Sequence, residues 1–134
     1  MVDQKTLDAF QQMWGPFPEP VLLVYKDRTI LATNDLAREV GVPVGVKCFS
    51  LNPEAVTKAC PQCKANVALK EKRTVCSEED YSGTTVIGYW MPLKENPEVY
   101  VHFGVGNAKL RGIQVNTAPY LTEKTPLVNV GDAN

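Results

Sequence analysis

The sequence predicts an α+β domain in which two strands come first, a group of short helices follows, and three antiparallel strands end the fold. Three observations carry this prediction. Two apolar segments near residues 21–33 flank a polar turn. Residues 48–72 then combine cysteines, prolines and helix-forming residues. Beyond them, three segments of strand-like composition are separated by turn sequences, which is typical of strands joined by hairpins.

The chain opens with an amphipathic helix. Apolar residues between Asp3 and Trp14 recur at three- and four-residue spacing, which gives a helix one apolar face. The following connector, Gly15–Pro20, is rich in proline and therefore stiff. We expect this helix to lie outside the domain proper and to cover a sheet or a second subunit.

A hairpin and a short helix are expected next. The predicted elements are a strand at Val21–Tyr25, a turn at Lys26–Arg28, a strand at Thr29–Thr33 and a helix at Leu36–Val40. Asn34 or Asp35 can cap this helix, because both side chains accept hydrogen bonds from the first free N–H groups. Gly41 ends it.

The cysteine-rich segment predicts two helical pieces. Asn52 can cap the first piece, with a proline in its first turn. A proline disfavours helical geometry in the residue before it, so we expect Cys60 to be the N-cap of a second helix over Pro61–Lys70. The sulfurs of Cys60 and Cys63 would then lie beside unpaired N–H groups, which favours the thiolate form.

The last part of the domain returns to extended structure. The predicted strands are Arg73–Asp80, Thr84–Leu93 and Glu98–Val105. We therefore divide the chain into a flanking helix and connector at residues 1–17, a central domain at residues 18–106, and a C-terminal tail without assigned structure at residues 107–134.

Composition limits the function. A chain of 134 residues is long enough for one ordinary core, and its formal net charge of −1 argues against a nucleic acid or acidic membrane recognised by bulk charge. The N-terminal segment has early acidic residues and no long apolar run, so we expect neither a signal peptide nor a membrane span, and a cytoplasmic location.

The cysteines are the strongest chemical signal. All four, Cys48, Cys60, Cys63 and Cys76, fall between residues 48 and 76. In a reducing cytosol, clustered cysteines more often indicate metal or redox chemistry than structural disulfides. We expect the fold to gather these four thiols into one site as metal or cofactor ligands, preferably for an iron–sulfur cluster, with zinc as the alternative.

Two other interpretations stay open. The cysteines can be ordinary core residues, since a free thiol packs like a small hydrophobic group, and the domain would then bind a small organic ligand or none. Cys60 and Cys63 can instead form a reversible disulfide, as in a thiol–disulfide oxidoreductase. Zinc would also fit a metal-stabilised interaction module.

Other chemistry is sparse. His102 is the only histidine, and strand alternation places it with Tyr100, opposite a face formed by Val99, Val101 and Phe103. We interpret His102 as a structural residue that can lie near a ligand on the sheet. No glycine-rich phosphate loop or nucleophile elbow is present in the sequence, so we do not expect an enzyme.

At this point the sequence resembles the PAS domain family. Ile30, Asn34, Ala37 and Gly41 fit the spacing of the first PAS hairpin and helix, and the returning strands GTTVIGYWMPL and EVYVHFGVG are similar to the later PAS strands. The resemblance covers residues 18–105. More specifically, the chain is similar to PAS domains of bacterial sensor proteins that carry a Gly-x-x-Cys loop and a following Cys-x-x-Cys, matched here at residues 45–48 and 60–63.

The resemblance implies a five-stranded antiparallel sheet with short helices over one face. It also implies sensing: such domains bind a cofactor or small molecule between helices and sheet, or mediate dimerisation. They are usually joined to a kinase or a DNA-binding module. We therefore expect a homodimeric sensor of redox state or a small ligand, which acts through a kinase or transcription regulator in trans or is part of a longer protein.

Overall fold

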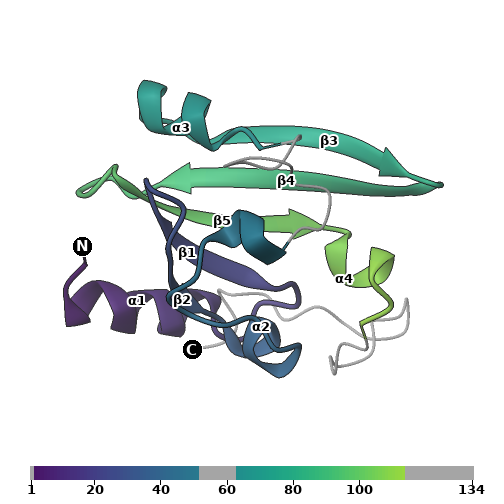
Figure 1. The fold of residues 1–134 in the computed structure, drawn as a ribbon, viewed down its shortest axis with the longest axis horizontal. Coiled ribbons are helices and arrows are strands. Elements are labelled where there is room, and N and C mark those ends of the chain that lie inside the picture. The colour runs from purple at the N-terminus through teal and green to yellow at the C-terminus, as the bar shows by residue number, and fades with distance from the viewer. Residues whose placement is uncertain (1, 52–62, 114–134) are drawn as a thin grey trace, which may run out of the picture.

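The computed structural model describes residues 2–51 and 63–113. Its elements are α1 (Gln4–Trp14), β1 (Val21–Tyr25), β2 (Ile30–Thr33), α2 (Asp35–Glu39), the short 3-10 helix η1 (Cys48–Leu51), α3 (Ala65–Glu71), β3 (Val75–Tyr81), β4 (Thr84–Pro92), β5 (Val99–Val105) and α4 (Asn107–Leu110). Their order agrees with the predicted sequence of two strands, short helices and three strands (Figure 1).

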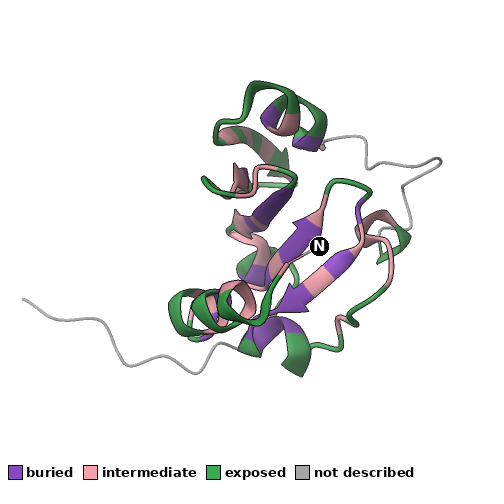
Figure 2. Cartoon of the chain, turned by 90° about the vertical axis from the view of Figure 1, so that its left-hand side faces the viewer, coloured by how far each residue is buried: buried purple, intermediate pink, exposed green. Residues whose placement is uncertain are grey.

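The strands form one five-stranded antiparallel sheet in the order β2-β1-β5-β4-β3. The two halves of the sheet come from opposite ends of the domain, and they meet where β1 pairs with β5. This central pair carries the most deeply buried side chains, so β5 lies in the middle of the core. Figure 2 shows buried residues concentrated along these strands and exposed residues on the outer surface of α1.

One face of the sheet is covered by α1. Phe10 of the helix is buried there against Leu23, Val101 and Phe103, and partly buried Trp14 packs beside them. The rings of Trp14 and Phe103 have centroids 5.1 Å apart. The predicted amphipathic helix is therefore present, and its apolar side packs on the sheet of its own chain.

The opposite face carries a second apolar cluster under η1 and α3. Its buried members are Val24, Ala65, Ala68, Trp90 and Tyr100, and the partly buried Cys48 and Cys63 pack against them. Alternation along β5 separates the two faces, because neighbouring residues of a strand point to opposite sides. His102 and Tyr100 are two residues apart on β5, so they lie on the same face, as expected from the sequence. Their partners on β1, Leu22 and Val24, are also two residues apart.

Asn34 holds the junction between α1, the connector and the sheet. Its side chain is fully buried and is the N-cap of α2, where Oδ1 accepts from the Ala37 N–H at 3.1 Å. The same oxygen accepts from the Val21 N–H at 2.9 Å. The Nδ2 group donates to carbonyl oxygens of Trp14, Phe17 and Glu19. One amide thus satisfies backbone groups from three segments, as the capping prediction for Asn34 or Asp35 partly anticipates.

A second junction joins the connector to α4. The Glu19 carboxylate accepts from the N–H groups of Gly106 and Ala108 at 2.8 and 2.7 Å. Residues 107–110 therefore form a short helix tied to the domain, in a tail to which the sequence assigns no structure. The remainder of that tail, residues 114–134, lies outside the described residues.

The second cysteine helix begins later than predicted. The helix α3 begins at Ala65, and its N-cap is Lys64. The prediction of a helix over Pro61–Lys70 is therefore wrong at its start, and Cys60 is not the N-cap of this helix. A physical reason is visible at Cys63, whose sulfur accepts the Ala65 N–H and thereby takes the capping role from outside the helix. Cys60 and the helix expected after Asn52 lie outside the described residues. None of the described helices is long and apolar enough to cross a membrane.

Candidate cysteine site

Cys48 is positioned by the turn between β1 and β2. Its N–H donates to the carbonyl of Arg28 at 2.8 Å, and Lys47 just before it forms an isolated antiparallel bridge with Thr29. An ion pair between Lys47 and Asp27, at 3.0 Å, adds a second tie. The half-buried Cys48 side chain therefore starts η1 at a place fixed by the hairpin turn.

Cys63, which follows residues 52–62 in the sequence, packs against the same apolar cluster as Cys48. It precedes α3, which is seated on the sheet by the fully buried Ala65 and Ala68. The Ala65 N–H lies 3.5 Å from Cys63 Sγ, a distance normal for a hydrogen bond to sulfur. A backbone donor aimed at sulfur stabilises a thiolate or a metal-bound sulfur more than a neutral thiol.

Tyr100 lies close to both of these cysteines. Its side chain is buried near the start of β5. Burial raises the pKa of the Tyr100 phenol, and the neighbouring sulfurs of Cys48 and Cys63 raise this pKa further because negative charges disfavour one another. The Arg28 guanidinium opposes the shift. The phenol thus stays protonated at neutral pH and can donate a hydrogen bond toward sulfur.

Arg28 completes the group, and sequence reasoning missed it. The residue sits in the hairpin turn with φ +77°, and only 7% of it is exposed. Nη1 donates to the Lys26 carbonyl at 2.5 Å and Nη2 to Asn66 Oδ1 at 2.6 Å, while the guanidinium carbon lies 5.9 Å from the centroid of the Tyr100 ring. We call Arg28, Cys48, Cys63 and Tyr100 the Tyr100 site.

The structure does not bring Cys76 to the Tyr100 site. Cys76 is exposed and pairs with Tyr89 on β4, which in turn pairs with Phe103 on β5. Directly paired residues of antiparallel strands share a face of the sheet. Because Phe103 belongs to the cluster under α1, Cys76 points to the α1 side, away from Tyr100.

The described residues supply only part of the expected set of metal ligands. Cys60 lies outside the described residues. Among the described residues, no group of three or more histidine, cysteine, aspartate and glutamate side chains is placed to hold a metal ion. The described chain therefore supplies two thiols to the Tyr100 site, and a third cysteine ligand can come only from Cys60.

His102 lies on the same face of the sheet as Tyr100. Its ring stacks on Trp90 with centroids 4.8 Å apart, and Nδ1 lies 2.8 Å from the Tyr89 carbonyl oxygen. A carbonyl oxygen only accepts, so Nδ1 carries the proton and Nε2 is the acceptor. Burial lowers the pKa of His102, which keeps the ring neutral. This agrees with the structural role expected from the sequence.

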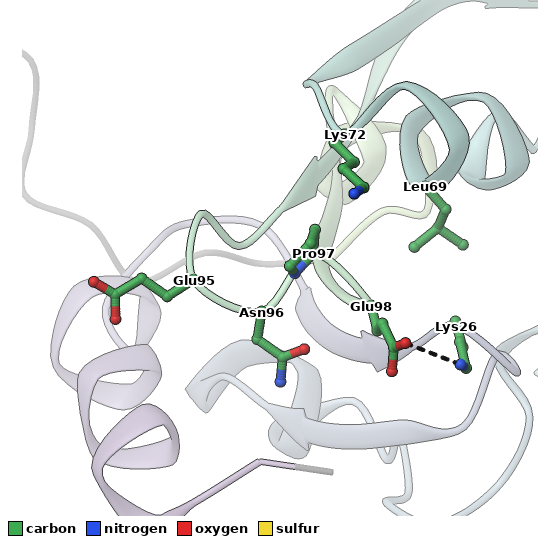
Figure 3. Close-up of a pocket in the computed structure, with 7 residues that line it drawn as sticks. All are labelled: Lys26, Leu69, Lys72, Glu95, Asn96, Pro97 and Glu98. Atoms are coloured by element: carbon green, nitrogen blue, oxygen red, sulfur yellow. Dashed lines mark hydrogen bonds and ion pairs between the residues drawn. The ribbon is translucent and has the colours of Figure 1, made fainter.

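A separate surface cleft of about 480 Å³ lies at the other end of α3. Its lining residues are Lys26, Leu69, Lys72, Glu95, Asn96, Pro97 and Glu98. Two of them, Lys26 and Glu98, form an exposed ion pair at 3.1 Å (Figure 3). No residue of the Tyr100 site lines this cleft, but α3 borders both places, because Ala65 and Ala68 pack in the cluster of Tyr100 and Leu69 lines the cleft.

Comparison with known proteins gives similarity in fold. A sensory box sensor histidine kinase from Vibrio cholerae matches with a TM-score of 0.54 at 15% identity, over 75% of this chain and 88% of the other. A domain of an HTR-like protein from Haloarcula marismortui gives 0.46 at 17% identity, over 65% and 93% of the two chains. The PAS domain of BvgS from Bordetella pertussis gives 0.44 at 16% identity, over 83% and 91%.

No family model and no curated protein matches the sequence. The five-stranded antiparallel sheet, its short helices and the N-terminal helix match the PAS fold, so the predicted fold class is confirmed. At this level of identity the likeness establishes the fold alone. The chemistry must therefore be argued from the Tyr100 site.

Proposed function

We propose that this PAS-fold domain is a sensor whose Tyr100 site holds a thiolate-bound metal centre, with an iron–sulfur cluster as the preferred occupant and zinc as the alternative. The observation that carries the proposal is the convergence of Cys48 and Cys63 on Tyr100 from two separate segments. Thiolate sulfur is the donor that both zinc and iron–sulfur clusters prefer. The solved structure from Vibrio cholerae, a sensor histidine kinase by its description, supports a role in sensing.

The residues present fit such a centre. Two half-buried sulfurs face one apolar cluster, and Cys63 Sγ already accepts a backbone N–H. Such N–H donors to sulfur are among the features that tune the reduction potential of an iron–sulfur cluster. In our proposal Cys60 supplies the third thiolate, and Cys76 is left out because it lies on the other face of the sheet.

Three thiolates leave one coordination position of a zinc ion or a four-iron cluster open to a ligand other than cysteine. A bound centre would fix η1 and α3 to each other through Cys48, which begins η1, and Cys63, which precedes α3. Loss of the centre on oxidation would release α3, which also borders the surface cleft. This gives the domain a route by which redox state or a small ligand changes its surface.

Output in this proposal needs no catalysis by the domain. A cytoplasmic homodimer would pass the change in α3 to a kinase or transcription regulator in trans, or to a neighbouring module of a longer protein. Size-exclusion chromatography with light scattering, before and after oxidation, tests the dimer and its response.

The central test is metal analysis of protein purified without oxygen. Iron, acid-labile sulfide and zinc are measured in the wild type and in single cysteine-to-serine variants. We expect Cys48→Ser, Cys60→Ser and Cys63→Ser to lose the metal. Cys76→Ser is the matched control and should retain it.

Two results would contradict the proposal. Metal loss on replacement of Cys76 alone would show that the ligand set is different. A metal-free wild type with a Cys60–Cys63 disulfide would instead favour a thiol redox switch, and ordered binding of an organic molecule by a variant lacking all four cysteines would favour a ligand-binding module.

A further inference from the structure

Arg28 carries a buried charge that no described group balances. Only 7% of the residue is exposed, and none of the ion pairs among the described residues includes it. Its two hydrogen-bond acceptors, the Lys26 carbonyl and the Asn66 amide, are both neutral. The Nε–H group has no hydrogen-bond partner in the described part of the chain. A buried cation with an unused donor is costly unless an anion accompanies it.

The position of this charge follows from the turn that carries it. The left-handed backbone at Arg28, with φ +77°, folds the side chain back over the sheet. The backbone carbonyl of the same residue receives the Cys48 N–H. One residue therefore joins the hairpin turn, the start of η1, α3 through Asn66, and the ring of Tyr100.

The expected occupants are anions. Three thiolates outweigh the two positive charges of a zinc ion or of an oxidised four-iron core, so either centre has net negative charge when bound by three cysteines. A centre of that charge inside a protein needs a nearby cation or donor, which is one of the known ways in which a protein tunes it.

We infer that the Tyr100 site is built for an anionic occupant and that Arg28 is its counter-cation, with Nε–H as the donor left free for it. This rests on the proposed function for the identity of the occupant. Arg28 is then a positioning and charge-balancing residue, and it is not a metal ligand. The site selects a negatively charged thiolate centre over a neutral apolar molecule.

The first measurement uses the loaded protein. Arg28→Met keeps an unbranched apolar stem and removes the charge, and Arg28→Lys keeps the charge but removes the planar donor. We expect Arg28→Met to retain less metal and to shift the reduction potential of a bound cluster to more negative values, because electron uptake adds negative charge that no cation offsets. Arg28→Lys should keep a potential near that of the wild type.

The second measurement uses the metal-free protein, and its readout is the unfolding temperature. If Arg28 is an unbalanced cation, Arg28→Met removes a destabilising charge, and the unfolding temperature stays unchanged or rises by a few degrees. Its former partners can be hydrated, since Lys26 and Asn66 are exposed. If Arg28 serves the fold alone, Arg28→Met lowers the unfolding temperature of metal-free and loaded protein equally.

Two control variants complete the design. Asn66→Ala removes one bond of Arg28 without changing the charge, so the reduction potential should not follow it. Glu54 is the only carboxylate among residues 52–62 and lies outside the described residues. If Glu54→Gln reproduces every effect of Arg28→Met, then a protein carboxylate is the counter-ion, and the inference is overturned.

The outcomes separate this inference from the proposed function. If the wild type binds metal and Arg28→Met matches it in metal content and reduction potential, the inference fails and the function stands. If the wild type binds no metal, the proposed function fails. The metal-free measurement still decides about Arg28, because a lower unfolding temperature for Arg28→Met overturns the unbalanced cation, and an unchanged or higher one supports it.

Discussion

Replacing Asn34 with alanine should remove the strongest polar junction of the domain. The side chain is fully buried, and its oxygen accepts from the N–H groups of Val21 and Ala37 at 2.9 and 3.1 Å. Each buried N–H left without a partner costs about 1–3 kcal/mol, and loss of an N-cap side chain about 1 kcal/mol. The carbonyls that Nδ2 serves lose their donor as well. We expect a loss of about 3 to 5 kcal/mol in the free energy of unfolding.

Urea denaturation followed by circular dichroism measures this loss. For a domain of this size the loss corresponds to a fall of about 2 M in the urea midpoint. Asp35→Ala is the neighbouring control, because Asp35 is exposed and its ion pair with Arg38 is worth less than about 1 kcal/mol. If Asn34→Ala unfolds within 1 kcal/mol of this control, the junction does not stabilise the domain in the way described.

Asn34→Asp tests the donor half of the same junction. Aspartate keeps one acceptor oxygen and has a second oxygen in the place of Nδ2, beside the carbonyl oxygens of Trp14, Phe17 and Glu19. Folding then raises the pKa of the new carboxyl, because the buried ionised form faces other acceptors. The native state binds the proton more tightly, so the deficit should be smallest below pH 4 and should grow as pH rises through the raised pKa. A deficit that does not vary between pH 4 and 7 would count against the assignment.

Three further predictions concern the turns and the histidine. Gly106→Ala should destabilise the domain by at least about 2 kcal/mol, because an added Cβ would lie 2.3 Å from a carbonyl oxygen of β4. Gly83→Ala is the control: Gly83 has a similar φ but lies in open space, so the change should cost about 1 kcal/mol. Equal urea midpoints for the two variants would refute this prediction. The Thr29 N–H, with a nearby lysine, lowers the pKa of Asp27 from 3.8 to about 2, so its stabilisation is full above pH 4 and lost as pH falls toward 2. Asp27→Asn should flatten that part of the plot of unfolding temperature against pH, and an unchanged slope would contradict the assignment. His102, the only histidine, should show a proton NMR titration midpoint below 6.5, because burial disfavours its charged form, and a midpoint above that value would disprove the burial.

The sheet could be predicted closely from sequence because its strands differ from their surroundings in composition. The expected strand Val21–Tyr25 has the same bounds in the structure, and Thr84–Leu93 differs by one residue at its end. Each strand is bounded by turn-forming residues that the sequence shows directly. The start of α3 could not be predicted, because the first N–H group is capped by a sulfur two residues before the helix.

The candidate site could be predicted only in part. The importance of Cys48 and Cys63 follows from the spacing of the cysteines, and the structure places both on one apolar cluster. The face on which Cys76 lies depends on register with β4, which no local pattern in the sequence specifies. The sequence predicts a turn at Lys26–Arg28, but it does not indicate that the Arg28 side chain is buried. Its burial depends on a left-handed backbone conformation that the sequence does not signal for arginine.

The central strand β5 divides its side chains between two different neighbours. Val101 and Phe103 pack toward α1, while Tyr100 lies on the opposite face, in the cluster that Cys48 and Cys63 contact. Protein interiors are close-packed and yield little to compression. If a change at the cysteines tilts Tyr100, we therefore expect β5 to rotate about its own axis. That rotation would displace Val101 and Phe103, the side chains of β5 on which α1 packs. In this way a single sheet can transmit a structural change from one of its faces to the other.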